Sequence, residues 1–301
     1  MSTKLNLFAT VLTYAAPSSN YRGESEENRT VLQKITKGGK EYPIISPESM
    51  RNALREMLQA VAPYNRTRLH NEDQLAVEFK EFPDPEKYAD DFFFGYLVTE
   101  KKAVEQNKGK PVKRDSVFRM NMAVSLTPYK FNAVFHQSPQ SKLSEAKNSG
   151  LFHREVAHTA YQYPFALAQR DCLAVKDGST WTPVKDGATW TKALLTAIGQ
   201  LSNVAGGHAR SLYEMAPASI VARLTPSLVA GYDTYGFDEK GGFAELSRIK
   251  ENDLPGGEFW IGGEIMRKMA ADERARFEAE KVKLYDNPQR LLADLAEAFL
   301  Q

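Results

Sequence analysis

The order of regular elements along the 301-residue sequence predicts an α+β fold with a ferredoxin-like βαββαβ core and large insertions. Three observations lead to this prediction. A β-branched and aromatic stretch at 4–14 precedes a well-capped helix, alternating apolar residues return from 117, and a second helix precedes an apolar strand at 218–224. The composition, 42% hydrophobic and 26% charged, is that of an ordinary folded protein and excludes disulfide scaffolds and wholesale disorder.

The first helix has the clearest start signal in the sequence. Ser46 is a good N-cap, Pro47 suits the first helical position, and Glu48 complements the helix dipole. An apolar stripe at helical spacing follows: Met50, Ala53, Leu54, Met57, Leu58 and Val61. Arg51 and Arg55 lie four residues apart and project together from another face, although an ion pair between Arg51 and Glu48 is an equally good interpretation.

The middle of the chain predicts two insertions around a strand. Residues 64–115 lack regular strand spacing and predict a partly helical insertion. Alternation after residue 116 assigns one strand face to Phe118, Met120, Met122, Val124 and Leu126, and the other to Arg119, Asn121 and Ser125. The polar stretch 136–150 predicts a protruding hairpin loop, and Pro164 predicts an edge or a bulge in the strand that follows it.

The last third of the sequence predicts turns and helices. The near-duplicates VKDGSTWT and VKDGATWT predict paired Asp-Gly turns before a helix at about 189–204, which would end at Gly206 and Gly207. Two further helical stretches are expected, at about 263–283 and from Pro288 onward.

The charges are distributed unevenly, although the formal net charge is only +1. Residues 101–154 carry eleven basic and three acidic side chains, whereas residues 233–301 carry ten basic and fifteen acidic ones. Such asymmetry suggests a polyanionic partner or head-to-tail assembly with copies of the same chain, and a solvated lysine-rich loop is the simpler alternative.

The sequence offers no positive sign of an enzyme, a metal site or a cofactor. Motifs such as HExxH, GxSxG and the P-loop are absent, and the histidines are not clustered. The single cysteine, Cys172, fits a reducing cytoplasm. No apolar run approaches the roughly 20 residues of a membrane span, so no membrane partner is expected, and polar Asn6 and Thr10 disfavour a signal peptide.

The signals for nucleic acid are weak individually. The aromatic motif with which RNA recognition motifs (RRMs) stack bases is missing, so the sheet is not expected to bind RNA in that manner. Basic groups instead occur on the first helix, near Arg119, in the loop with Lys142 and Lys147, and beside Gly206 and Gly207. Glycine-rich turns let backbone N–H groups approach phosphates, but an ordinary helix C-cap explains these two glycines equally well.

Three segments resemble the Cas-seven family, in particular its DevR-type branch of type I-B CRISPR systems. They are NLFATVLTYAAPSSNYRGESEENRTVLQKI, IISPESMRNALREML and NVAGGHARSLYEMAPASIVARLT, in this serial order. The resemblance implies a hand-shaped subunit with an RRM-like palm (1–63, 116–135 and 153–301), a fingers insertion (64–115) and a thumb hairpin (136–152). It further implies a non-enzymatic backbone subunit of a Cascade surveillance complex, which polymerises head to tail along a CRISPR guide RNA and supports pairing with target DNA beside other Cascade subunits.

The resemblance also assigns residues. It implies RNA contacts by Arg22, Arg29, Arg51, Arg55, Arg114, Arg119, Gly206, Gly207, His208 and Arg210. The thumb residues would be Lys142, Leu143 and Lys147, with Leu143 as the wedge between bases. Related subunits that cut RNA use a thumb aspartate; the loop here has Glu145 but no aspartate, so no catalytic residue is expected. Two alternatives remain: a metal-dependent nuclease of a defence locus, and a DNA-binding autoregulator.

Overall fold

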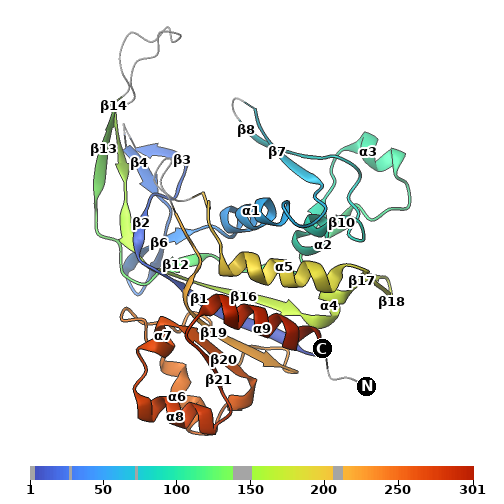
Figure 1. Cartoon of the computed structure of the whole chain (residues 1–301). Coiled ribbons are helices and arrows are strands. Elements are labelled where there is room, and N and C mark those ends of the chain that lie inside the picture. Colours follow the sequence, from blue (N-terminus) through green and yellow to red (C-terminus); the bar gives the residue numbers. More distant parts are fainter. Residues whose placement is uncertain (1–3, 27–28, 72–73, 138–150, 206–212) are drawn as a thin grey trace.

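A nine-stranded sheet forms the centre of the molecule (Figure 1). The computed structural model describes residues 4–26, 29–71, 74–137, 151–205 and 213–301. The strands of the sheet are, in spatial order, β21 (Lys283–Tyr285), β20 (Phe259–Gly263), β19 (Pro217–Thr225), β1 (Asn6–Thr13), β16 (Tyr161–Ala168), β12 (Ala123–Ser125), β6 (Lys40–Ile45) and β5 (Lys34–Lys37), with β11 (Arg119–Met120) also pairing with β16.

The middle of this sheet contains a βαββαβ succession. Along the chain it consists of β1, helix α1 (Pro47–Leu58), β12, β16, helix α5 (Gly187–Gly199) and β19, and in space its strands lie in the order β19, β1, β16, β12. Each of these neighbours pairs antiparallel. The mixed helix-and-sheet architecture predicted from the sequence is therefore confirmed.

The two faces of the sheet are covered by different parts of the chain. Alternate residues of β1 separate them: Leu7, Ala9 and Val11 pack into the core formed with α1, α5 and α9 (Pro288–Leu300). On the other face, Leu12 packs into a second core with residues from the C-terminal third, including Tyr232 and Phe277. The elements of that covering layer are η1 (Ala244–Leu246), α6 (Ser247–Lys250), η2 (Gly256–Glu258), α7 (Glu264–Arg267) and α8 (Ala271–Ala279).

The C-terminal third differs from its prediction. The expected long helix at 263–283 consists of two short helices, α7 and α8, and the strands β20 and β21 on either side of them were not anticipated. Gly262 and Gly263 in β20 permit close approach: a Cβ on Gly263 would overlap the Ala218 carbonyl of β19. The glycine-rich sequence FWIGG thus weakens the strand signal in the sequence although the strand is fully buried.

Pro164 lies in a central strand, so its predicted edge position is wrong, and the bulge beside it lies in the partner segment between β11 and β12 rather than in its own strand. The strand β16 has β1 on one side and β11 and β12 on the other. Between Met120 and Val124 the pairing with β16 shifts by one residue, and the Pro164 carbonyl accepts a hydrogen bond from the Asn121 N–H (3.2 Å). The shift also reverses the buried face: Phe118 is buried before it, whereas Ala123 and Ser125, rather than Val124, are buried after it.

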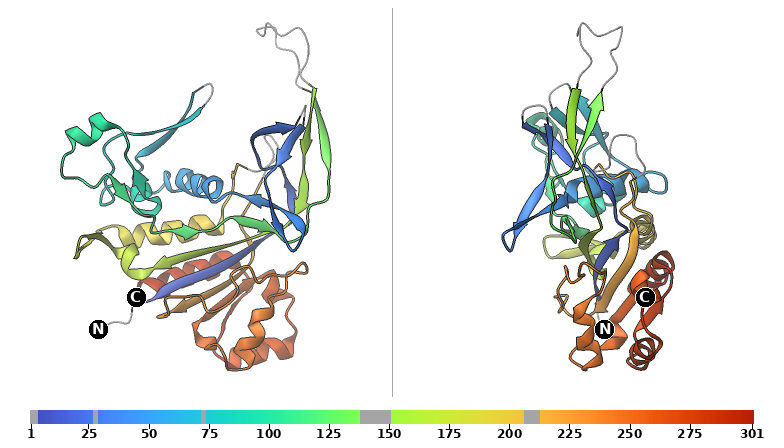
Figure 2. Two further views of the ribbon diagram at one scale, coloured as in Figure 1. Left: turned by 180° about the vertical axis from the view of Figure 1, so that it is seen from behind. Right: turned by 90° about the vertical axis from the view of Figure 1, so that its left-hand side faces the viewer.

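Two projections rise from the sheet at opposite ends of α1 (Figures 1 and 2). The first is a sheet of β13 (Ala133–Gln137), β14 (Leu151–Glu155), β4 (Arg29–Leu32) and β3 (Tyr21–Glu26), below which β2 (Ala16–Ser18) pairs with β15 (Ala157–Thr159). The second contains β7 (Arg66–Asn71), β8 (Gln74–Phe79), α2 (Ala89–Phe94), β9 (Tyr96–Leu97), α3 (Lys101–Gln106) and β10 (Lys113–Arg114). The pairing of β13 with β14 agrees with the predicted hairpin, whereas the β7–β8 hairpin was not foreseen.

A third, smaller hairpin follows α4 (Gln169–Leu173). It consists of β17 (Ala174–Asp177) and β18 (Thr180–Pro183), and its turn at Gly178 is the first of the two predicted Asp-Gly turns. The second Asp-Gly also lies at a turn, since the Gly187 N–H donates a hydrogen bond to the Val184 carbonyl (3.1 Å), and Asp186 is at the same time the N-cap of α5. Among the helices in the described part of the chain, none has the length and hydropathy needed to cross a bilayer.

Candidate nucleic-acid interface

Helix α1 begins as its sequence predicts. Ser46 is the N-cap and its Oγ accepts a hydrogen bond from the Ser49 N–H (3.2 Å), while Pro47 occupies the first turn. Met50, Ala53, Leu54 and Leu58 are buried as expected, but the helix ends before Val61, which is exposed. This packing fixes the direction in which the remaining face of α1 points.

Arg51 and Arg55 project from that face onto α2 of the second projection. The Arg51 Nη2 donates hydrogen bonds to the Phe94 carbonyl (2.7 Å) and to the Ser116 Oγ (3.1 Å). The guanidinium carbons of Arg51 and Arg55 lie 5.6 Å and 4.5 Å from the centre of the Phe94 ring. The alternative interpretation of Arg51, an ion pair with Glu48, is not realised among the described residues. Burial lowers the pKa of Arg51, and the charge of Glu48 opposes that shift only in part.

A groove of about 1010 Å³ lies between the two projections, with α1 at its base. Four arginines from three elements line it: Arg51 and Arg55 of α1, Arg66 of β7 and Arg114 of β10. On the side of the first projection, Asn20, Tyr21 and Gln33 line it. The structure thus brings the sequence-predicted Arg51, Arg55 and Arg114 to one groove and adds Arg66, which the sequence analysis did not single out.

Three arginines of this groove, Arg51, Arg55 and Arg114, hold their charges at a free-energy cost. Arg55 is only 8% exposed, and burial together with the charges of Arg66 and Arg51 lowers its pKa to about 9. Burial also lowers the pKa of Arg114 and Arg51. None of the described residues accepts a hydrogen bond from the Nε of these three arginines. Because arginine remains protonated at neutral pH, the lowered pKa values represent a cost of holding charge that a bound anion would offset.

The base of the second projection is fixed by two buried carboxylates of α2. Asp90 accepts hydrogen bonds from the backbone N–H groups of Asn65 (2.9 Å) and Arg66 (2.8 Å). Asp91 accepts from the Asn65 side chain (2.7 Å) and from the Asp84 N–H (3.0 Å). The start of β7, and with it Arg66, is therefore held against the helix whose last residue is Phe94.

The other sequence-predicted residues lie elsewhere or outside the described residues. Arg119 is exposed on β11 and lines a neighbouring cavity rather than the groove. Arg22 and Arg29 have their backbones in strands β3 and β4, and Arg22 follows the groove-lining Tyr21. Outside the described residues lie Lys142, Leu143, Lys147, Gly206, Gly207, His208 and Arg210.

The predicted helix end at Gly206 is wrong. Helix α5 ends at Gly199, and the Gln289 side chain of α9 donates a hydrogen bond to the Gly199 carbonyl (3.0 Å). The interpretation of Gly206 and Gly207 as a C-cap is therefore wrong as well. The segment after the helix returns toward the interface, since Ala205 lines the groove.

The second face of the central sheet is covered by the C-terminal third of the chain. Thr10 of β1 donates to the Thr234 carbonyl (2.9 Å), and the Gln162 side chain of β16 bonds to both backbone groups of Phe237 (3.1 Å each). The described residues contain no group of three or more His, Cys, Asp or Glu side chains placed to hold a metal ion.

Several residues of this region escaped the sequence analysis. Phe94 is part of the aromatic run DDFFFGYLV, which predicts core packing but not contact with the arginines of α1. Arg66 begins the segment RTRLHN, which pairs with QLAVEF. Leu69 is the one aliphatic residue of RTRLHN, so no apolar alternation marks this strand and no sequence signal places Arg66.

Comparison with known proteins now adds to this geometry. Two solved chains, from a "CRISPR RNA-guided surveillance complex, pre-nicking" and a "CRISPR RNA-guided surveillance complex", align with TM-scores of 0.62 and 0.57 at 13% and 12% identity. The alignments cover 98% and 97% of this chain and 100% and 99% of those chains, and at such identities they show a shared fold.

Sequence comparison is more specific. The CRISPR-associated protein Cas7/Cst2/DevR of Myxococcus xanthus (strain DK1622) is 32% identical over 291 residues, which is 90% of this chain and 90% of that protein. The family model of the CRISPR-associated negative auto-regulator DevR/Csa2 matches residues 10–225. These two matches agree with the resemblance of the three sequence segments. The chain belongs to the DevR/Csa2 family of CRISPR-associated proteins, the DevR-type branch of the Cas-seven family.

Proposed function

We propose that this chain is an RNA-binding backbone subunit of a type I-B CRISPR surveillance complex, without enzymatic activity of its own. The observation that carries the proposal is the groove in which Arg51, Arg55, Arg66 and Arg114 converge. Guanidinium groups bind phosphate oxygens in bidentate fashion, and a cluster of them along a groove is suited to a phosphodiester backbone. The family and the surveillance-complex chains of the same fold support a guide RNA as the ligand.

The proposed parts of the hand follow from this placement. The central sheet with α1 and α5 would be the RRM-like palm, since its strand order and antiparallel pairing are those of a βαββαβ domain. Residues 64–115 would be the fingers and 136–152 the thumb. The guide would lie between them against α1, and base pairing of the guide would select the target DNA.

Assembly with copies of the same chain is the second part of the proposal. The excess of acidic side chains in residues 233–301 faces, in a head-to-tail arrangement, the basic excess of residues 101–154 of the next copy. Other subunits of the complex would bind at the ends of the resulting filament. Such a particle would be cytoplasmic.

Binding of guide-length RNA to the double variant Arg51→Gln/Arg55→Gln tests the proposal. Loss of two charge-assisted contacts predicts an affinity at least about 10-fold weaker. The slope of log affinity against log salt should become shallower by about 1.4. The matched control is Arg274→Gln/Arg276→Gln, two exposed arginines of α8. Fluorescence anisotropy measures binding, and circular dichroism establishes that each variant is folded.

Three outcomes would contradict the proposal. A folded double variant that binds RNA as tightly as the control pair would exclude the groove. Preference for duplex DNA over guide RNA would favour the DNA-binding autoregulator instead. Cleavage of labelled RNA in the presence of Mg²⁺ or Mn²⁺ would favour the nuclease.

A further inference from the structure

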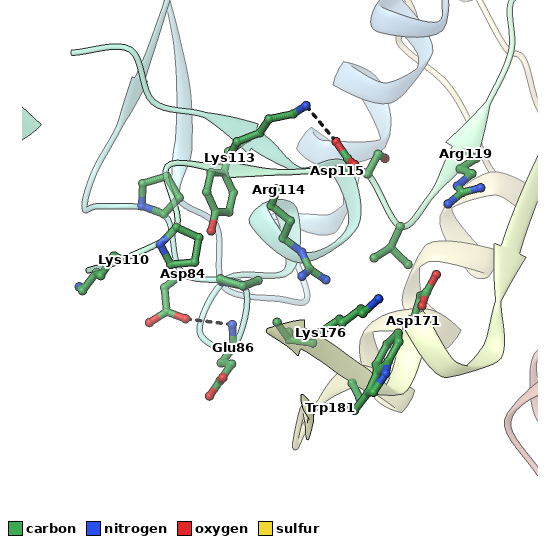
Figure 3. Close-up of a pocket in the computed structure, with 18 residues that line it drawn as sticks. Asp84, Glu86, Lys110, Lys113, Arg114, Asp115, Arg119, Asp171, Lys176 and Trp181 are labelled. Carbon is green, nitrogen blue, oxygen red and sulfur yellow. Dashed lines mark hydrogen bonds and ion pairs between the residues drawn. The ribbon is translucent and has the colours of Figure 1, made fainter. Parts of the chain in front are cut away.

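A second cavity of about 580 Å³ adjoins the groove (Figure 3). It lies between the second projection and the β17–β18 hairpin, and the two hollows share the lining residues Tyr96, Arg114, Asp115 and Ser116. Arg114 therefore stands at the boundary between them. A ligand that follows the groove past Arg114 enters this cavity.

The cavity has a surplus of cations once its internal pairs are subtracted. Lys113 forms an exposed ion pair with Asp115 (3.6 Å), and the Asp84 carboxylate accepts hydrogen bonds from backbone N–H groups of residues 86 and 87. Within the described residues, Arg114, Arg119 and Lys176 have no ion pair. With Lys110 the lining has five basic side chains against the four carboxylates Asp84, Glu86, Asp115 and Asp171, so its net charge is +1.

The cavity also contains an aromatic surface. Trp181 of β18 lines it, and the Arg170 guanidinium lies over one face of the indole, with its carbon 3.7 Å from the centre of one ring, so a base can stack only on the opposite face. The other two tryptophans, Trp190 and Trp260, are 4% and 5% exposed, whereas Trp181 is partly exposed. Unpaired cations beside an accessible indole are the combination with which proteins bind single-stranded nucleic acid, because phosphates meet the cations and a base meets the ring.

We propose that this cavity is a second polynucleotide subsite, which holds a nucleotide of a single strand that continues from the arginine groove past Arg114. Lys176 and Arg119 bind its phosphates, and Trp181 contacts its base. The inference rests on the proposed function, because it extends the same path. The strand is either the guide itself or a strand paired with the guide, and the experiment separates these two sources.

Tryptophan emission gives a direct measurement, because Trp181 is the accessible tryptophan. Guide-length RNA is added to the whole protein, alone and then with a complementary DNA strand, while anisotropy of the labelled RNA records binding in the same sample. We expect quenching that is lost in Trp181→Phe. In Lys176→Gln/Arg119→Gln, the RNA affinity should fall roughly 3- to 10-fold and the salt slope should become shallower by about 1.4. The control pair is Lys185→Gln/Arg276→Gln, which are exposed and line neither hollow.

The outcomes separate this inference from the proposed function. Quenching by the guide alone assigns the guide to the cavity, and quenching that appears only with the complement assigns the paired strand. RNA binding by anisotropy without quenching in either arm overturns the subsite and leaves the proposed function intact. Absence of RNA binding overturns both. Quenching by polyglutamate as strong as that by RNA would show that the cavity takes an acidic polypeptide, which also overturns the inference.

Discussion

The guanidinium carbon of Arg55 lies 4.5 Å from the centre of the Phe94 ring, so a residue of the second projection holds the cation of a helix that belongs to the central fold. The same residue accepts a hydrogen bond from Arg51 through its carbonyl (2.7 Å). Both arginines of α1 are thus positioned by α2. A shift of the projection would displace them together.

Substitution of Phe94 by leucine removes the ring and keeps an apolar side chain. A cation–π contact is worth about 0.5–2 kcal/mol, so we predict that Phe94→Leu weakens RNA binding roughly 3- to 10-fold. The matched control is Phe118→Leu: Phe118 is fully buried and its ring lies 6.0 Å from that of Phe94, but it contacts neither arginine. Equal RNA affinities for the two folded variants, measured by anisotropy, would exclude a positioning role for the Phe94 ring.

Gly95 follows Phe94 and has a φ of 65°, a conformation that favours glycine. A Cβ at this position would overlap the Arg114 carbonyl oxygen. We predict that Gly95→Ala lowers the free energy of unfolding by more than the roughly 1–3 kcal/mol of an unfavourable φ, and that it weakens RNA binding through displacement of Arg114.

Gly39→Ala is the control for this prediction. Gly39 has a φ of 75° in the β5–β6 turn, but a Cβ there would meet nothing within 4 Å. The Gly39→Ala variant therefore has the conformational cost of a positive φ, but its Cβ overlaps no neighbouring atom. Urea denaturation measures both variants, and equal losses of stability would mean that the close approach of Gly95 to Arg114 has no energetic importance.

Asp91 makes stability depend on pH. Burial raises its pKa to about 6, despite the hydrogen bonds from Asn65 and Asp84. This pKa lies above the value of about 3.9 in an unfolded chain. Protonated Asp91 therefore contributes to the free energy of unfolding at low pH, and that contribution is lost as the pH rises through about 6. The amide of Asp91→Asn can still accept both hydrogen bonds and does not ionise.

We therefore compare the melting temperature of Asp91→Asn with that of the unsubstituted protein at two pH values. We predict that the variant gains more, or loses less, at pH 7 than at pH 4. The control is Asp272→Asn, because Asp272 is exposed on α8. Thermal unfolding followed by circular dichroism at the two pH values gives the comparison. The prediction would be contradicted if the melting temperatures of the two proteins differed by the same amount at pH 4 and at pH 7.

Elements specified by local signals were predictable from the sequence. The cap at Ser46 and the Asp-Gly turn at Gly178 depend on neighbouring residues, and both are found where expected. The end of α5 was not predictable, because Gln289, ninety residues away, bonds to Gly199. Strand β20 was not predicted, because its glycines have low strand propensity and are required for close packing against β19.

The candidate site shows the same division. Arg51 and Arg55 could be placed on one helix face from their spacing, since four residues separate neighbours on a helix. The position of Phe94 beside these two arginines, and of Arg114 in the same groove, depends on how residues 64–115 fold back onto α1. That arrangement is held by Asp90 and Asp91, whose bonding partners are distributed between residues 65 and 84.

The covered second face of the central sheet limits what the proposed RNA-binding subunit can recognise. Side chains of β1 and β16 such as Thr10 and Gln162, which an open sheet would offer to bases, bond to the C-terminal layer instead. In the proposed function, a strand in the arginine groove would be bound through its phosphates, which are identical at every nucleotide. Such a protein would be indifferent to the order of bases, so one gene product could carry guides of any sequence without adaptation of a single side chain.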